Sequence, residues 1–237
     1  MFLRSIHLLA ALSAIALPAA AAPDDFRYKV DTLLEGMPQP MQLHFDPEGR
    51  IFFNELGGKL KIYDPKTKAV TEAGSLKVTL AQENGFLGFA LDPHFGQNRF
   101  VYCLYSPPDF EGQKLSRFTL VDDRLDPTSE KLVLSFAEQR KDCCHHAGKM
   151  MFGPDGLLYF STGDNTNPFE YSKAYSPIDE RPNRGPYDAQ KSSANANDLR
   201  GKINRIRIKP DGTYDIPPGN LFPPGTPGTR PEIYVMG

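Results

Sequence analysis

The feature that most constrains the fold of this chain is a turn followed by a strand, which recurs along the sequence. "FDPEGRIFF" (45–53) and "FGPDGLLYF" (152–160) share one frame: an aromatic residue, Asp or Gly, Pro, an acid, Gly and then an apolar strand. "LDPHFGQNRFVYCLY" (91–105) is a looser third copy. Proline presets φ for a type I turn, and the glycine takes the left-handed conformation that lets the next strand leave.

The spacing of the copies predicts a β-propeller. Their prolines stand at positions 47, 93 and 154, and a period near 45 residues with several short strands per repeat is typical of propeller blades. Further strand-like segments follow the copies, among them "KLKIYD", "KLSRFTL", "KLVLSFA" and "GKINRIRIKPDGTY". The chain has 22 prolines, 20 glycines and almost no helical periodicity, which favours many short strands over a helical bundle. Repeats stacked as a sandwich or a solenoid remain the alternatives.

The first 22 residues predict a secretory signal peptide. "MFLR" gives a positive start, "SIHLLAALSAIALP" an apolar run and "AAAA" (19–22) the small residues of a cleavage site. A core helix at the N-terminus is the other interpretation. The apolar run is too short to span a bilayer, and no other run is long and apolar enough to do so. We therefore expect a soluble, exported protein, either periplasmic or secreted.

Charge and cysteine content narrow the possible partners and chemistry. The net charge of -2, with no concentrated basic patch, argues against a nucleic-acid partner. Cys103, Cys143 and Cys144 make an odd count. In an oxidising compartment the simplest arrangement is one disulfide and one free thiol, with the pairing open.

The end of the chain predicts an incomplete domain. The sequence stops at "RPEIYVMG", within an apolar strand pattern, after three expected blades and the start of a fourth. Such an arc leaves unpaired sheet edges, so we expect residues 23–237 to be a partial propeller domain, truncated at its C-terminus. Residues 165–198 form a long polar stretch rich in Pro, Asn and Ser. A loop of this length is usually functional or disordered, and this one should overhang the rim that carries Asp164.

The most informative stretch is "KDCCHHAGKMMFGPDGLLYFSTGD" (141–164). A turn centred on Pro154 and Asp155 places His145 opposite Asp164, although a bulge at Gly156 would shift the register by one residue. Opposite Cβ atoms lie about 4.5–5.5 Å apart, so the carboxylate could accept a hydrogen bond from Nδ1–H and leave Nε2 free to take a proton. The alternative is a surface pair that only caps the hairpin.

Two other groups of residues have more than one interpretation. The consecutive Cys143, Cys144, His145 and His146 suit a metal poorly, because zinc ligands are usually spaced by two or more residues and strand neighbours point to opposite faces. A Cys143–Cys144 disulfide, or one cysteine buried and unpaired, are both possible. In "ENGFLGFALDPHF" (83–95), Glu83 could face the same rim as His145, or it is a solvated turn carboxylate.

The motifs "ENGFLGFALDPHF…NRFVYCLY", "LSRFTL", "HHAGKMMFGPDGLLYFSTGD", "LRGKINRI" and "PEIYVMG" occur in the order found in the soluble glucose/sorbosone dehydrogenase family. These are quinoproteins dependent on pyrroloquinoline quinone (PQQ), and the resemblance runs from about position 40 to 237. It implies a six-bladed β-propeller with PQQ and calcium over the central channel. It also implies oxidation of an aldose or related sugar, with electrons passed to an external acceptor.

The resemblance also suggests roles for single residues. By resemblance, His145 matches the catalytic base and Asp164 the carboxylate that orients it. Glu83 aligns near a polar residue of the cofactor and sugar pocket, and Lys149 stands where Arg or Lys follows the glycine.

The sequence departs from the family pattern in three places. Cys144 replaces an Asp that often precedes the base, and the loop 165–198 is longer than in compact members. The family's Arg-Asn pair that contacts PQQ would come after Gly237, as would further cationic contacts and the carbonyls around the calcium. Each charge-assisted hydrogen bond is worth roughly 1.5–3 kcal/mol, so we expect this polypeptide alone to bind PQQ poorly and to oxidise little sugar.

The sequence leaves two other functions open. One is a non-catalytic exported propeller that binds a protein or glycan on its loop rim. The other, less favoured, is a calcium-dependent lactonase-type propeller.

Overall fold

The computed structural model describes residues 29–169 and 178–237. The predicted signal peptide, residues 1–22, lies outside the described residues. The contacts divide the chain into residues 1–36 and residues 37–237. Every strand described below belongs to the second unit.

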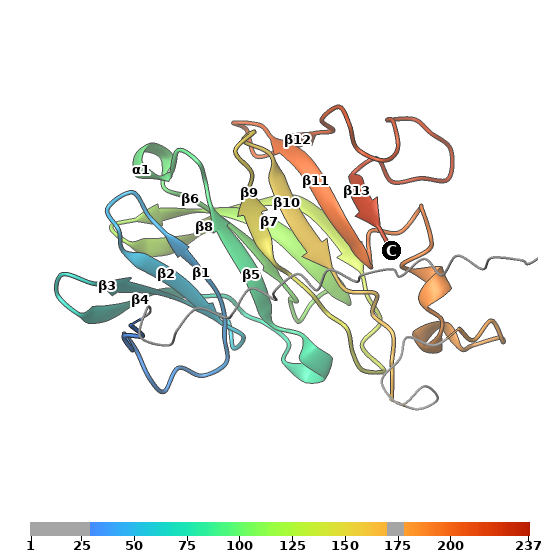
Figure 1. Ribbon diagram of the computed structural model, residues 1–237, viewed down its shortest axis with the longest axis horizontal. Coiled ribbons are helices and arrows are strands. Elements are labelled where there is room, and N and C mark those ends of the chain that lie inside the picture. Colours follow the sequence, from blue (N-terminus) through green and yellow to red (C-terminus); the bar gives the residue numbers. More distant parts are fainter. Residues whose placement is uncertain (1–28, 170–177) are drawn as a thin grey trace, which may run out of the picture. The chain divides into compact units, whose positions relative to one another are not determined.

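The second unit consists of three antiparallel sheets that follow one another along the chain, as the colours of Figure 1 show. The first sheet contains β1 (Pro40–Phe45), β2 (Ile51–Glu55), β3 (Lys59–Asp64) and β4 (Ala69–Ser75). The second contains β5 (Phe86–Leu91), β6 (Phe100–Tyr105), β7 (Gly112–Val121) and β8 (Arg124–Ala137). The third contains β9 (Met150–Phe152), β10 (Leu158–Thr162), β11 (Lys202–Ile208), β12 (Tyr214–Asp215) and β13 (Ile233–Met236).

Helical structure in the described residues is limited to single turns. These are α1 (Phe95–Asn98) and the 3₁₀ turns η2 (Ala81–Glu83), η3 (Gly185–Tyr187) and η4 (Ala189–Lys191). From β1 to β12, consecutive strands within each sheet pair with one another, which is the blade arrangement of a β-propeller. The predicted all-β propeller architecture is therefore confirmed, with three blades. Residues 233–236, which we expected to begin a fourth blade, instead pair with β11 inside the third sheet.

The repeated turns take the conformation that their sequence predicts. Gly49 and Gly156 have φ values of 82° and 72°. Each closes its turn by donating a backbone hydrogen bond three residues back, to Asp46 O at 3.0 Å and to Gly153 O at 2.9 Å. The same turn occurs between β11 and β12, where Gly212 N donates to Lys209 O at 2.9 Å. This copy, "IKPDGTY", was expected to be part of a strand, because no aromatic residue opens its frame.

The innermost strands β1, β5 and β9 come from three different sheets, and the buried side chain of Gln42 on β1 joins them. Its amide nitrogen donates to Phe89 O at 2.8 Å and to Met150 O at 2.5 Å, and its oxygen accepts from Met150 N at 3.1 Å. The backbones also approach closely at Gly88, where an added Cβ would lie 1.9 Å from Gly148 O. The sheets therefore meet through backbone contacts that leave little room for larger side chains.

Two apolar cores fill the spaces between sheets. One includes Phe52, Phe89 and Phe118 from the first and second sheets. The other includes Leu115 of the second sheet and Phe160 of the third. Because each core draws on two successive sheets, burial of apolar side chains couples neighbouring blades.

Replacing Gln42 by leucine is expected to destabilise the fold by about 2–5 kcal/mol, because the buried polar groups of Phe89 and Met150 would lose their partner. The measurement is the free energy of unfolding from urea denaturation. Gln97→Leu is the matched control, since Gln97 is exposed and its substitution should change stability by no more than about 0.5 kcal/mol. Equal stability of the two variants would show that Gln42 does not join the sheets.

Candidate active site

His145 and Asp164 meet where the chain enters and leaves the β9–β10 hairpin. His145 lies in the loop before β9, Asp164 follows β10, and His145 Nδ1 is 2.8 Å from Asp164 Oδ1. The register differs by one residue from that of a turn centred on Pro154 and Asp155, which is the shift expected from a bulge at Gly156: Phe160 pairs with Met150 and not with Lys149. The two side chains still meet, because both lie beyond the regular ladder and their loops converge.

The backbones of these two loops are in direct contact. Asn165 N donates to His145 O at 3.2 Å, and Cys144 N donates to Thr166 O at 3.0 Å. Gly163 permits this approach, since a Cβ there would lie 1.7 Å from His145 O. His145 itself has a φ of 53°, a left-handed conformation that a non-glycine residue keeps only when its surroundings hold it. The loop thus fixes the position of the imidazole.

The surroundings of Asp164 keep its carboxylate turned toward the histidine. Its Oδ1 also accepts from Thr166 N at 3.1 Å and from Thr166 Oγ1 at 2.9 Å. A carboxylate on Nδ1 favours the tautomer with hydrogen on that nitrogen. The His145 side chain is 34% exposed, and its Nε2 has no hydrogen-bond partner among the described residues. This nitrogen can therefore accept a proton from a bound molecule.

His146 has the opposite environment. Its side chain and that of Glu138 are fully buried, and its Nδ1 lies 2.9 Å from Glu138 Oε2. Its Nε2 is 3.4 Å from Asn84 Nδ2. Of the two adjacent histidines, only His145 presents an open ring nitrogen to solvent. Glu138, Asn84 and Thr166 were not predicted from the sequence, because none of them stands in a recognisable spacing with the histidines.

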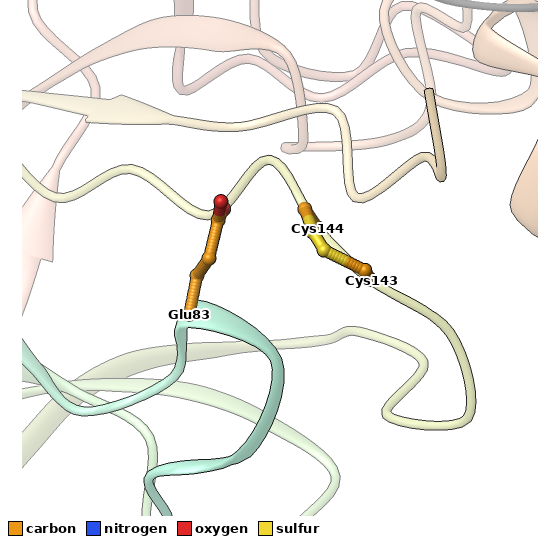
Figure 2. A group of neighbouring side chains, drawn as sticks. All are labelled: Glu83, Cys143 and Cys144. Atoms are coloured by element: carbon orange, nitrogen blue, oxygen red, sulfur yellow. A yellow bond between two sulfur atoms is a disulfide. The ribbon is translucent and has the colours of Figure 1, made fainter. Parts of the chain in front are cut away.

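Glu83 lies beside the loop that carries His145. In Figure 2 its side chain rises from the turn before β5 toward Cys143 and Cys144. One Glu83 carboxylate oxygen and the two sulfurs lie within 4.8 Å of one another, and Glu83 Oε2 accepts from His146 N at 3.3 Å. The two cysteines are joined by a disulfide, and Cys103 is a buried free thiol. This matches the simplest arrangement expected from the cysteine count. Because metal ligation requires thiolates, the disulfide form offers Glu83 no sulfur partners for a metal ion.

Lys149 directly precedes β9 and is exposed. Its backbone N donates to Ser161 Oγ at 3.1 Å, and its ammonium makes no ion pair with any residue that the structure describes. Burial lowers the pKa of His44 on β1, and the charge of Lys149 lowers it further. The Lys149 ammonium is therefore close enough to β1 to act on His44 electrostatically.

Comparison with known proteins gives the family. The family model described as Glucose / Sorbosone dehydrogenase matches residues 37–237. The chain belongs to this family. It is 28% identical over 218 residues to an uncharacterized protein of Synechocystis, covering 88% of the chain and 49% of that protein. It is 25% identical over 229 residues to quinoprotein glucose dehydrogenase B of Acinetobacter calcoaceticus, covering 92% of the chain and 45% of that enzyme.

Solved structures of sugar dehydrogenases share the fold. An oxidoreductase described as a glucose dehydrogenase, from Thermus thermophilus, superposes with a TM-score of 0.69 at 27% identity, over 88% of this chain and 55% of that one. The PQQ-bound aldose sugar dehydrogenase of Streptomyces coelicolor gives a TM-score of 0.63 at 24% identity, over 86% and 52%. The chain spans about half the length of the relatives it matches. Within the described ranges, no helix has the length and apolar character needed to cross a membrane.

In this member of the glucose/sorbosone dehydrogenase family, the long polar loop is ordered where it is described. Asn165 anchors its start: its amide bonds with the backbone of Gln139, accepting from N at 2.8 Å and donating to O at 3.1 Å. Tyr187 OH donates to Asp142 Oδ1 at 2.9 Å, and Asn167 N donates to Pro186 O at 2.7 Å. The described part contains the 3₁₀ turns η3 and η4.

The other end of the loop is held by Lys202 at the start of β11. Its buried ammonium donates to Ser192 O at 2.7 Å, Ser193 O at 2.8 Å and Arg200 O at 2.7 Å. Burial lowers the pKa of Lys202 to about 8, while the three carbonyls satisfy its three N–H groups. The described portion of the loop is thus attached near His145 at one end and to β11 at the other.

Proposed function

We propose that the protein oxidises an aldose or a related sugar with PQQ and passes the electrons to an external acceptor. Membership of the glucose/sorbosone dehydrogenase family supports this proposal. The observation that carries it is the His145–Asp164 pair, in which a carboxylate holds Nδ1 at 2.8 Å and leaves Nε2 open at an exposed edge. That arrangement suits a general base better than a hairpin cap, since a cap needs no open ring nitrogen.

The proposed chemistry divides the work between the two side chains. His145 Nε2 accepts the proton of the sugar's anomeric hydroxyl while the anomeric carbon loses its hydrogen as hydride and its C–O bond becomes a carbonyl. Asp164 holds the imidazole in the required tautomer and stabilises the imidazolium that forms. PQQ, when bound, supplies the hydride acceptor.

The charges of the described residues fit a carboxylate-bearing cofactor and a polyhydroxylated substrate. We assign Lys149 to the cofactor, because it is an exposed cation without an ion-pair partner in the described part of the chain, and PQQ carries carboxylates. Glu83, assigned at the sequence level to the cofactor, is an exposed carboxylate beside the base and is better suited to accept hydrogen bonds from sugar hydroxyls. The vicinal disulfide adds no charge next to His145.

The test is dye-linked turnover by the protein expressed from its complete reading frame, with added PQQ and calcium and a panel of aldoses. We expect saturable dye reduction that requires both PQQ and sugar. Binding of PQQ without reduction in the presence of any sugar would contradict the proposal. Cleavage after residue 22 and recovery of the protein outside the cytoplasm are expected in the same preparation, since we propose that it is exported.

A further inference from the structure

A second histidine–carboxylate pair involves the residue next to the proposed base and has no part in the reaction described above. The side chains of His146 and Glu138 are both fully buried, with Nδ1 and Oε2 2.9 Å apart. Removing a carboxylate from water is costly unless hydrogen bonds replace its hydration. A pair kept at this depth must therefore be held tightly by its neighbours.

The neighbours that hold this pair lie in the second sheet or directly next to its strands. Gln113 on β7 donates from Nε2 to both oxygens of Glu138, each at 3.0 Å. The backbone N of Glu138 donates to Glu111 O at 3.1 Å, and Asn84, just before β5, approaches the other ring nitrogen of His146 at 3.4 Å. His146 is thereby fixed to the second sheet, although it lies in the loop that leads into the third.

The two adjacent histidines thus anchor one loop to two different sheets. His146 bonds with Glu138, which follows β8 in the sequence, and His145 bonds with Asp164, which follows β10. Since His145 has a left-handed φ, its ring direction depends on where the following residue is held. The backbone N of His146 also donates to Glu83 Oε2, so the same anchor places the proposed sugar-binding carboxylate.

We propose that His146 is a positioning residue: its buried bond to Glu138 fixes the loop in which His145 Nε2 faces the substrate. The inference rests on the proposed role of His145 as base. A positioning role differs from a merely structural one in what the loss of the His146–Glu138 bond should change. A structural role predicts only lower global stability, whereas a positioning role also predicts a change in the His145 ring.

The test follows the His145 imidazole by NMR in the histidine-labelled chain, without PQQ or sugar. In wild type we expect one tautomer, with hydrogen on Nδ1. In His146→Leu we expect a mixture of tautomers and exchange of the Nδ1 hydrogen faster by at least about tenfold, the effect of losing one hydrogen bond to a charged group. His146→Asn keeps a donor toward Glu138 and should stay within about threefold of wild type. His94→Leu is the matched control, because His94 is an exposed histidine that also has an aspartate partner, with Nδ1 3.6 Å from Asp92 Oδ1.

Circular dichroism establishes that each variant is folded. If His146→Leu does not fold, Glu138→Gln decides in its place, since glutamine keeps the shape and removes the carboxylate; the same loss of a single His145 tautomer is expected. Unchanged His145 signals in the folded variant, or equal changes in His146→Leu and His146→Asn, would overturn the proposal. Because the readout needs no turnover, it separates this inference from the proposed function: an orienting effect can be found in a protein that oxidises no sugar.

Discussion

Replacing His145 by alanine is expected to slow PQQ-dependent sugar oxidation by about two to four orders of magnitude, the usual contribution of a general base. The reason is geometric. His145 offers the open ring nitrogen of the pair, whereas both nitrogens of the neighbouring His146 face buried partners. The measurement is kcat from dye reduction at saturating sugar, and the loss should fall on kcat more than on KM, because the proton moves only during the reaction.

The control for this experiment is His94→Ala, which removes an exposed imidazole and should leave kcat unchanged. Asp164→Asn should lower kcat without abolishing it, since the amide still fills the position but no longer favours the Nδ1–H tautomer. A His145→Ala protein with the kcat of wild type would show that the proton goes elsewhere and that His145 and Asp164 only close the hairpin.

Gly163→Ala should produce the second largest effect, although Gly163 contacts no substrate. Its new methyl group would lie 1.7 Å from His145 O and 2.4 Å from His145 C. Both are backbone atoms, so the loop itself must move. A displacement on the scale of 1 Å can cost about a hundredfold in rate. Overpacking of this kind also destabilises by about 1–3 kcal/mol. We expect both losses, measured as kcat and as the free energy of unfolding.

Gly57→Ala provides the comparison. Gly57 has no neighbour within 4 Å of an added Cβ and no left-handed φ, so alanine there should leave activity unchanged and stabilise slightly, by about 0.4–1 kcal/mol. If Gly163→Ala matched Gly57→Ala in both measurements, the close contact between the loops could not be what holds His145 in place.

The fold was largely predictable because its information is local. Each Pro-acid-Gly turn is specified by residues adjacent in sequence, and this was enough to identify the blades. The contact between His145 and Asp164 was also predictable, since a short hairpin brings the segments before and after it together even when the register shifts by one residue. The exact register was left open by one residue, because it depends on whether Gly156 takes the left-handed φ that adds a residue to one side of the turn, as it does here.

The residues that support the site could not be predicted in the same way. Gln42 bonds with Met150, and His146 with Glu138, across contacts between sheets or between a loop and a sheet. Their partners are set by how the blades pack, and one sequence carries no local mark of that packing. The contacts of the long loop could not be predicted for the same reason, because Tyr187 and Lys202 bond with carboxylate and carbonyl groups elsewhere in the chain.

The polar loop is attached at two points, through Asn165 near His145 and through Lys202 on β11. Exposed side chains between these two attachments, such as those of Glu180 and Pro182, belong to neither of them. Exchanging such side chains is therefore a way to alter the surface of the loop without loosening its hold on the rest of the protein.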